Sequence, residues 1–106
     1  MNPKFTQLNK RITFQIYKLA RDDMGGSIYT WHDGISVWAA VTPQKGNVKH
    51  RAHVDLKEGH YSIVIRYNEN ITENMRIKFN RQIFKIEKII NHNQADIFQI
   101  IYCREE

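Results

Sequence analysis

The chain has 106 residues, of which 42% are hydrophobic and 25% charged, with a formal net charge of +5 at pH 7. This length fits one domain over residues 1–106, and the apolar content excludes disorder along the whole chain. No apolar run approaches the roughly 18 residues of a membrane span, and the start lacks the apolar core of a signal peptide, so we expect no membrane contact and residence in the cytoplasm.

The first part of the chain reads as an extended segment that follows a polar start. Residues 1–9 are polar and expected to be flexible, and from Arg11 apolar and polar residues alternate with period two. Such alternation is typical of a half-buried strand with Ile12, Phe14 and Ile16 on one face. The following sequence, DDMGG at residues 22–26, predicts a turn because glycine accepts positive φ at little cost.

A second extended region follows the turn. Residues 27–31 predict a short return strand or an extended loop, and Gly34 then interrupts the pattern. Alternation resumes over residues 35–42 and predicts a second strand, which Pro43 ends because proline has no N–H for a ladder.

Residues 44–59, QKGNVKHRAHVDLKEG, fit neither a helix nor a strand period. We interpret them as a long mobile loop, with room for one or two helical turns. Loops of this length in a compact domain are usually functional or disordered, so a simple disordered insertion remains an alternative.

The strands resume after Gly59. Alternation predicts strands over residues 61–67, 75–79, 82–90 and 97–103. Asn80-Arg81 is a two-residue hairpin turn in this interpretation, since Asn tolerates the left-handed region. The doublet Ile89-Ile90 indicates a bulge or burial on both faces.

The predicted fold class is mainly β. Five to seven short strands with short connections favour a small antiparallel β-barrel or a tightly curled sandwich, with one long loop at about 44–59. The expected core side chains are Ile12, Phe14, Ile16, Val37, Ile63, Ile65, Ile77, Phe79, Phe84 and Ile86.

No catalytic or metal site emerges from the residues. His50, His53 and His60 lie in or beside the least ordered segment without a nearby Cys, whereas zinc needs three or four converging ligands. The only cysteine, Cys103, lies in an apolar strand, where a thiol is usually an inert core residue, and its lack of a partner agrees with a reducing compartment. We therefore expect no enzymatic activity and no cofactor.

Nucleic-acid binding is the rival interpretation. A small barrel with basic excess is compatible with an oligonucleotide-binding module, and Trp31 and Trp38 could stack bases. The cations are dispersed, however, and most aromatics share faces with Ile and Val, which favours core packing. Trp38 is out of phase with its apolar neighbours, so we expect it on the outer face as an anchor of a protein interface.

Several motifs in order resemble the head–tail joining family of long-tailed phages, the head-closure or stopper proteins. They are RITFQ (11–15), GG (25–26), TW (30–31), VWAAVTP (37–43), IRYN (65–68), MRIKFNRQIFKIEKI (75–89) and the closing IIYCREE. Together they cover nearly the whole chain. The turn at Asn80-Arg81 departs from the pattern, since many relatives would carry Gly there.

The resemblance implies a small β-barrel that forms a ring under the portal and its adaptor. Such a ring closes the capsid exit after packaging, retains the DNA and offers the tail its docking surface. The implied partners are further copies of the chain, the portal or adaptor, a tail or tail-terminator protein, and packaged double-stranded DNA held by non-specific contact. The implied location is the virion of a phage or prophage, assembled in the host cytoplasm.

The resemblance also assigns roles within the chain. Residues 44–59 look like the family's long loop, a gate over the DNA exit, and the cations expected to face DNA phosphates there are Lys45, Lys49, Arg51 and Lys57. The number of subunits in the ring is left open.

Overall fold

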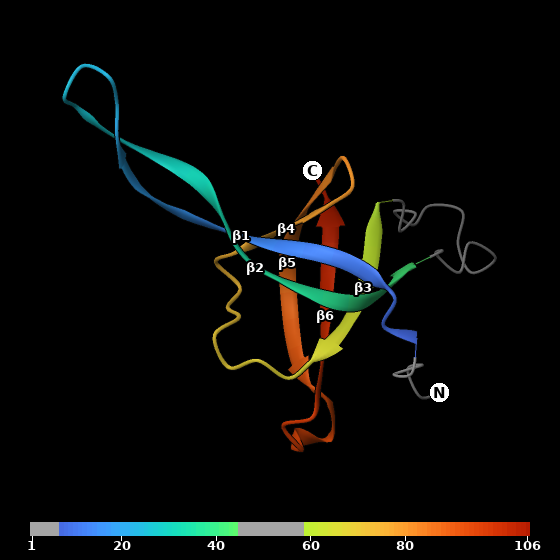
Figure 1. Cartoon of the computed structure of the whole chain (residues 1–106). Helices are drawn as coiled ribbons and strands as arrows, with labels where there is room; N and C mark the ends of the chain where they lie inside the picture. Colours follow the sequence, from blue (N-terminus) through green and yellow to red (C-terminus); the bar gives the residue numbers. More distant parts are fainter. Residues whose placement is uncertain (1–6, 45–58) are drawn as a thin grey trace.

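The computed structural model describes residues 7–44 and 59–106. Its elements are β1 (Lys10–Arg21), β2 (Ser27–Pro43), β3 (His60–Arg66), β4 (Arg76–Phe79), β5 (Gln82–Asn91), the 3₁₀ turn η3 (His92–Gln94) and β6 (Phe98–Glu105). Figure 1 shows the strands wrapped around one another, with part of the β1–β2 hairpin projecting far to one side. The described part of the chain contains no helix with the length and hydrophobicity of a membrane span.

The strands close into an antiparallel barrel in the order β1-β2-β3-β6-β5-β4, with β4 returning to β1. Barrel closure leaves no open sheet edge around the core. The predicted fold class is therefore confirmed as a mainly β, closed antiparallel barrel of six strands. Two of the strands are not short, because β1 has 12 residues and β2 has 17.

The barrel interior is filled by branched and aromatic side chains. Isoleucine dominates it, and Tyr61 packs edge-on against Phe84 with ring centroids 4.7 Å apart. Seven of the ten expected core residues are buried, and Val37 and Phe79 are partly buried against the same cluster. The buried seven are Ile12, Phe14, Ile63, Ile65, Ile77, Phe84 and Ile86.

The prediction for Ile16 is wrong, since its side chain is 39% exposed. Its place in the alternation is correct, but β1 pairs with β4 only from Thr13 to Gln15. Ile16 is the first residue past that pairing, where no strand of the barrel covers it.

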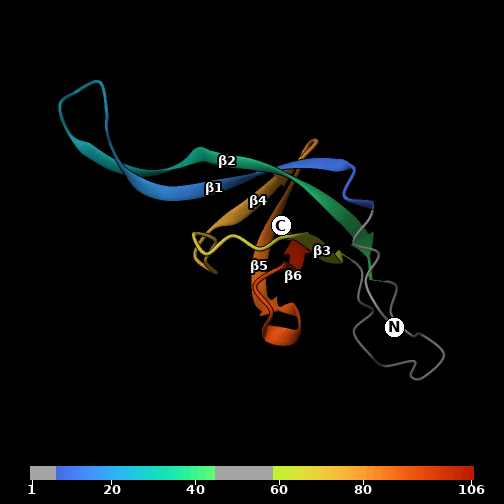
Figure 2. The ribbon, with the colours of Figure 1, turned by 60° about the horizontal axis from the view of Figure 1, so that its bottom comes forward.

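Gly34 does not interrupt the second extended region, which is one continuous strand. The register changes from Thr13↔Ser36 to Gln15↔Asp33, so β2 carries one extra residue opposite β1. A Cβ at Gly34 would lie 3.1 Å from the carbonyl oxygen of Phe14, which explains why this bulge position holds a glycine. The bulge bends the hairpin where it leaves the barrel, as Figure 2 shows from a second direction.

The predicted turns are present in the structure. Gly25 has φ +84° in the tip of the β1–β2 hairpin, and Asn80 adopts φ 55° in the β4–β5 turn. The bulge in β5 lies before the predicted doublet, as a register shift between Ile86 and Lys88, whereas Ile89 and Ile90 pair regularly with β6 and are both partly buried.

Cys103 is buried in β6, as expected for a core thiol, and it faces the interior beside Ile86 and Tyr61. Burial, with a smaller contribution from the negative charge of Glu87, raises the pKa of the thiol to about 12. The thiol is therefore protonated and shielded at neutral pH.

We predict that iodoacetamide at pH 8 labels Cys103 only after unfolding, because the thiolate is the nucleophile. Between the ordinary Cys pKa of 9.0 and about 12, the unfolded chain loses a proton that the folded chain keeps. The stability advantage of the wild type over Cys103→Ala should therefore shrink as pH rises above 9, as measured by urea unfolding at pH 8 and 10. Rapid labelling of the native protein would contradict this environment.

Candidate protein interface

The projecting part of the hairpin, residues 16–32, is here called the arm. Its strands pair only with each other, from Ile16↔His32 to Arg21↔Ser27, and extend about 20 Å from the barrel at about 3.3 Å per residue. The described molecule is elongated, with extents of 54 × 36 × 23 Å and a radius of gyration of 15.8 Å, compared with about 13 Å for a compact domain of this length.

The arm concentrates exposed apolar surface. Nine large hydrophobic side chains are exposed among the described residues, and six of them lie on the arm: Ile16, Tyr17, Leu19, Met24, Ile28 and Tyr29. A two-stranded ribbon is at best marginally stable in water without packing on one face. Apolar surface gathered on such a ribbon indicates a contact with another chain.

One face of the arm, here called the aromatic face, carries Tyr17, Leu19, Tyr29 and Trp31. The register pairs Tyr17 with Trp31 and Leu19 with Tyr29, which places the four on the same side. The Tyr17 ring lies 5.0 Å from Trp31 and 5.5 Å from Tyr29 between centroids. Tyr17 therefore packs against both neighbours, stacked on Tyr29 with an interplanar angle of 23° and tilted against Trp31 at 47°.

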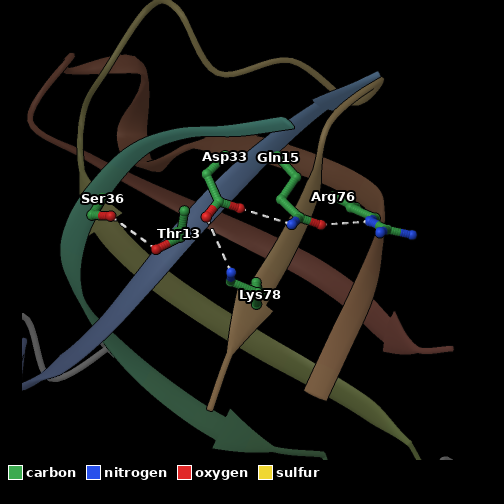
Figure 3. A network of polar contacts seen from close by, with 6 residues as sticks. All are labelled: Thr13, Gln15, Asp33, Ser36, Arg76 and Lys78. Carbon is green, nitrogen blue, oxygen red and sulfur yellow. Dashed lines mark hydrogen bonds and ion pairs between the residues drawn. The ribbon is translucent and has the colours of Figure 1, made fainter. Parts of the chain in front are cut away.

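A polar network anchors the root of the arm to β4 (Figure 3). The Gln15 side chain donates from Nε2 to Asp33 Oδ1 at 2.8 Å and accepts from Arg76 Nε at 2.7 Å. The Lys78 ammonium donates to the other carboxylate oxygen of Asp33 at 3.1 Å. Both ends of the buried Gln15 amide are thus satisfied, which avoids the cost of an unpaired polar group.

The same network reaches the aromatic face. The Arg76 guanidinium lies 4.3 Å from the centroid of the Trp31 ring, which is a cation–π contact. On the barrel side of this junction, the hydroxyls of Thr13 and Ser36 are hydrogen-bonded to each other at 2.8 Å. Next to it, Ile16, Tyr17, Trp31, Thr72, Asn74 and Met75 line an open depression, here called the root hollow.

Asp33 is the charged centre of this junction. Hydrogen bonds from Gln15 and then from Lys78 lower the pKa of its carboxyl below the ordinary value of 3.8. The carboxylate is therefore the form that holds the arm's root against β4.

Trp38 lies on the outer face of β2, as predicted, and is 54% exposed. The guanidinium of Arg11 lies 5.1 Å from its ring centroid. A hollow of about 370 Å³, here called the Trp38 hollow, adjoins it and is lined by Leu8, Arg11, Val37, Trp38, Arg66, Tyr67 and Asn68. Its role as an interface remains a prediction.

Within the described part of the chain, no other candidate residue from the sequence lies at the arm or at the Trp38 hollow. Lys45, Lys49, Arg51 and Lys57 lie outside them, as do His50 and His53. His60 begins β3, and its Nε2 lies 3.6 Å from Glu87 Oε1. No cluster of three metal-ligating side chains occurs within 7–44 and 59–106.

Sequence reasoning missed the arm. The signal was present: twelve residues from Lys10 to Arg21 continue in an extended pattern, longer than β3, β4 or β6. The apolar positions change phase along this stretch, from Ile12, Phe14 and Ile16 to Tyr17 and Leu19, and beyond Gln15 both faces are largely exposed to solvent. Trp31, considered from the sequence only as a residue that could stack bases, lies on the aromatic face beside Tyr17.

Known proteins share both the sequence pattern and the fold of this chain. The sequence profile of the family described as phage head completion protein matches residues 3–106. The solution structure of protein SF1141 from Shigella flexneri 2a is similar, with a TM-score of 0.72 and 29% identity over 97% of this chain and 96% of that one. A chain from the virion of a native gene transfer agent particle shares the fold, with a TM-score of 0.65 and 21% identity over 92% of this chain and 94% of that one. No curated protein is significantly similar to the chain.

We predict that Asp33→Ala increases amide exchange in the arm while the barrel strands keep their protection, because the network joins the arm's root to β4. In the wild type this anchoring is complete above the ordinary Asp pKa and is lost as pH falls through the lowered pKa of Asp33. Asp33→Asn should abolish that pH dependence. Equal protection of the arm in wild type and Asp33→Ala would show that the network does not anchor it.

Proposed function

This chain belongs to the phage head completion proteins, structural proteins of the virion, and we propose that it forms the ring that closes the head under the portal or its adaptor. In this proposal the ring retains the packaged double-stranded DNA and presents the docking surface for the tail. The family is a structural one, which points to a non-enzymatic role.

The observation that carries the proposal is the arm. A single chain leaves the aromatic face and the tip of a two-stranded ribbon in water, although such a ribbon needs packing to be stable. Neighbouring subunits or the flanking head and tail proteins would supply that packing. A monomeric barrel acting alone would have no use for this surface.

The arm and residues 45–58 adjoin β2 (Ser27–Pro43) at opposite ends. At the end away from the arm, the Gln44 N–H donates to the His60 carbonyl at 2.8 Å, and the Glu105 N–H donates to the Gly59 carbonyl at 2.6 Å. The two flanks of residues 45–58 are thus fixed at one end of the barrel. One end can therefore contact protein partners while the other faces a different component.

We assign DNA retention to the cations of that segment, Lys45, Lys49, Arg51 and Lys57. Contacts to phosphates hold the backbone without reading sequence, which suits a protein through which any packaged DNA passes. This assignment rests on the sequence and on the fixed flanks, and it is separable from ring formation.

We predict that particles made without this chain fill with DNA but lose it and carry no tails. Electron microscopy and nuclease sensitivity of the particles measure both effects, and supplying the wild-type chain should restore both. A variant with the four loop cations changed to Gln should restore tails but retain DNA less well. Tailed, nuclease-resistant particles in the absence of the chain would refute the proposed function.

The rival, an oligonucleotide-binding module, predicts a different outcome in solution. We expect the isolated chain to bind labelled single-stranded DNA weakly at moderate salt, because the cations are dispersed along the chain. Tight, saturable binding, lost in a Tyr17→Ala, Tyr29→Ala variant, would favour the rival. A titration followed by fluorescence anisotropy decides between them.

A further inference from the structure

We propose that the tip of the arm, Asp22–Gly26, docks in the Trp38 hollow of a neighbouring copy of this chain. The inference rests on the proposed ring and adds which two surfaces meet in it. Three observations support it: the chemistry of the tip, the chemistry of the hollow, and the distance between them along one hairpin.

The tip presents an apolar side chain beside an acid. Met24 is 91% exposed, so the fold of one chain does not use it. Asp22 Oδ1 accepts from the Met24 N–H at 2.9 Å and from the Gly26 N–H at 2.7 Å, which fixes the turn. Asp23 has no partner among the described residues and is available to a cation of another chain.

The Trp38 hollow has the complementary character. Leu8, Val37 and the Trp38 ring supply apolar surface, and Arg11 and Arg66 supply two positive charges. Each guanidinium lies over an aromatic ring, at 5.1 Å for Arg11 on Trp38 and 5.9 Å for Arg66 on Phe98. Neither is paired with a carboxylate within the part of the chain that the structure describes.

The tip and the hollow are complementary in two respects. The flexible Met24 side chain suits the aromatic and aliphatic walls of the hollow, and Asp23 suits its two arginines. Methionine adapts to irregular apolar pockets, and charge complementarity fixes the orientation of the contact. The root hollow is a poorer match, because its lining contains no cation and the adjacent Arg76 already donates to Gln15 and is paired with Glu106 at 3.7 Å.

The tip cannot reach the hollow of its own chain, so a tip that docks there comes from another copy. The tip and the wall of the hollow formed by Arg11, Val37 and Trp38 belong to the same β1–β2 hairpin, and Arg11 and Arg21 are ten positions apart along β1. At about 3.3 Å per residue they are about 33 Å apart, and the paired strands between them cannot fold back on themselves. A contact that joins different surfaces of successive copies is heterologous. It generates a closed ring when the rotation from one copy to the next adds up to a full turn.

Cysteine pairs test the contact in assembled particles. Met24→Cys with Asn68→Cys in the same chain should give a ladder of disulfide-linked oligomers on oxidation, since Cys103 is buried and does not compete. A mixture of the two single variants should stop at dimers. The matched control is Met24→Cys with Asn74→Cys, which places the second thiol in the root hollow and should give no ladder.

Charge exchange provides a second measurement that does not depend on thiol geometry. Asp23→Arg and Arg66→Asp should each reduce incorporation of the chain into particles about tenfold, because like charges then meet. The double variant should recover most of that loss. Asp23 makes no contact needed for the turn, so the tip should keep its fold.

The outcomes separate this inference from the proposed function. If DNA-filled, tailed particles contain the chain but only the Asn74 pair cross-links, or the thiol introduced by Met24→Cys links to a different protein, the docking inference is overturned while head closure stands. A ladder from the Asn68 pair together with charge rescue supports it. Particles that do not require the chain would instead refute the proposed function.

Discussion

The barrel closes through a very short contact, and the rest of the architecture depends on it. β4 has four residues and pairs with β1 only from Thr13 to Gln15. β1 is three times as long, and most of its remainder has no strand beside it except β2. The mismatch in strand length therefore produces the arm: every residue past Gln15 must leave the barrel with its partner on β2.

The junction between barrel and arm is where polar chemistry replaces apolar packing. On the inner face Phe14 and Ile77 are buried opposite each other, while on the outer face Gln15, Asp33 and Arg76 form a linked network. A buried amide is tolerated only when both of its ends find partners. The Gly34 bulge and this network together set the direction in which the arm projects, and neither contributes to the core.

Much of the fold was predictable because period-two alternation is a local property of each strand. It identified the barrel and most of its core, including Phe84 and Ile86. It failed at Ile16, because alternation shows which face a residue lies on but not whether a neighbouring strand covers that face. It also failed at Gly34, because a glycine within an alternating pattern can mark either a bulge inside one strand or the end of a strand. For the candidate interface, only Trp38 was predictable, from its phase; the aromatic face depends on cross-strand register, which a single sequence does not reveal.

A head-to-tail contact through a projecting arm does not by itself determine a ring, because the same interface makes an open filament when its rotation does not close. The arm's own energetics oppose uncontrolled growth. A two-stranded ribbon anchored only at its root is at best marginally stable alone, so each docking event must first order it, at about 1–2 kcal/mol of backbone entropy per residue fixed. In the proposed assembly, that cost would keep free subunits apart. A symmetric platform such as the portal or its adaptor would then raise the local concentration of subunits and fix their angles, so that the same weak contact, repeated around an axis, would close a ring only at the head.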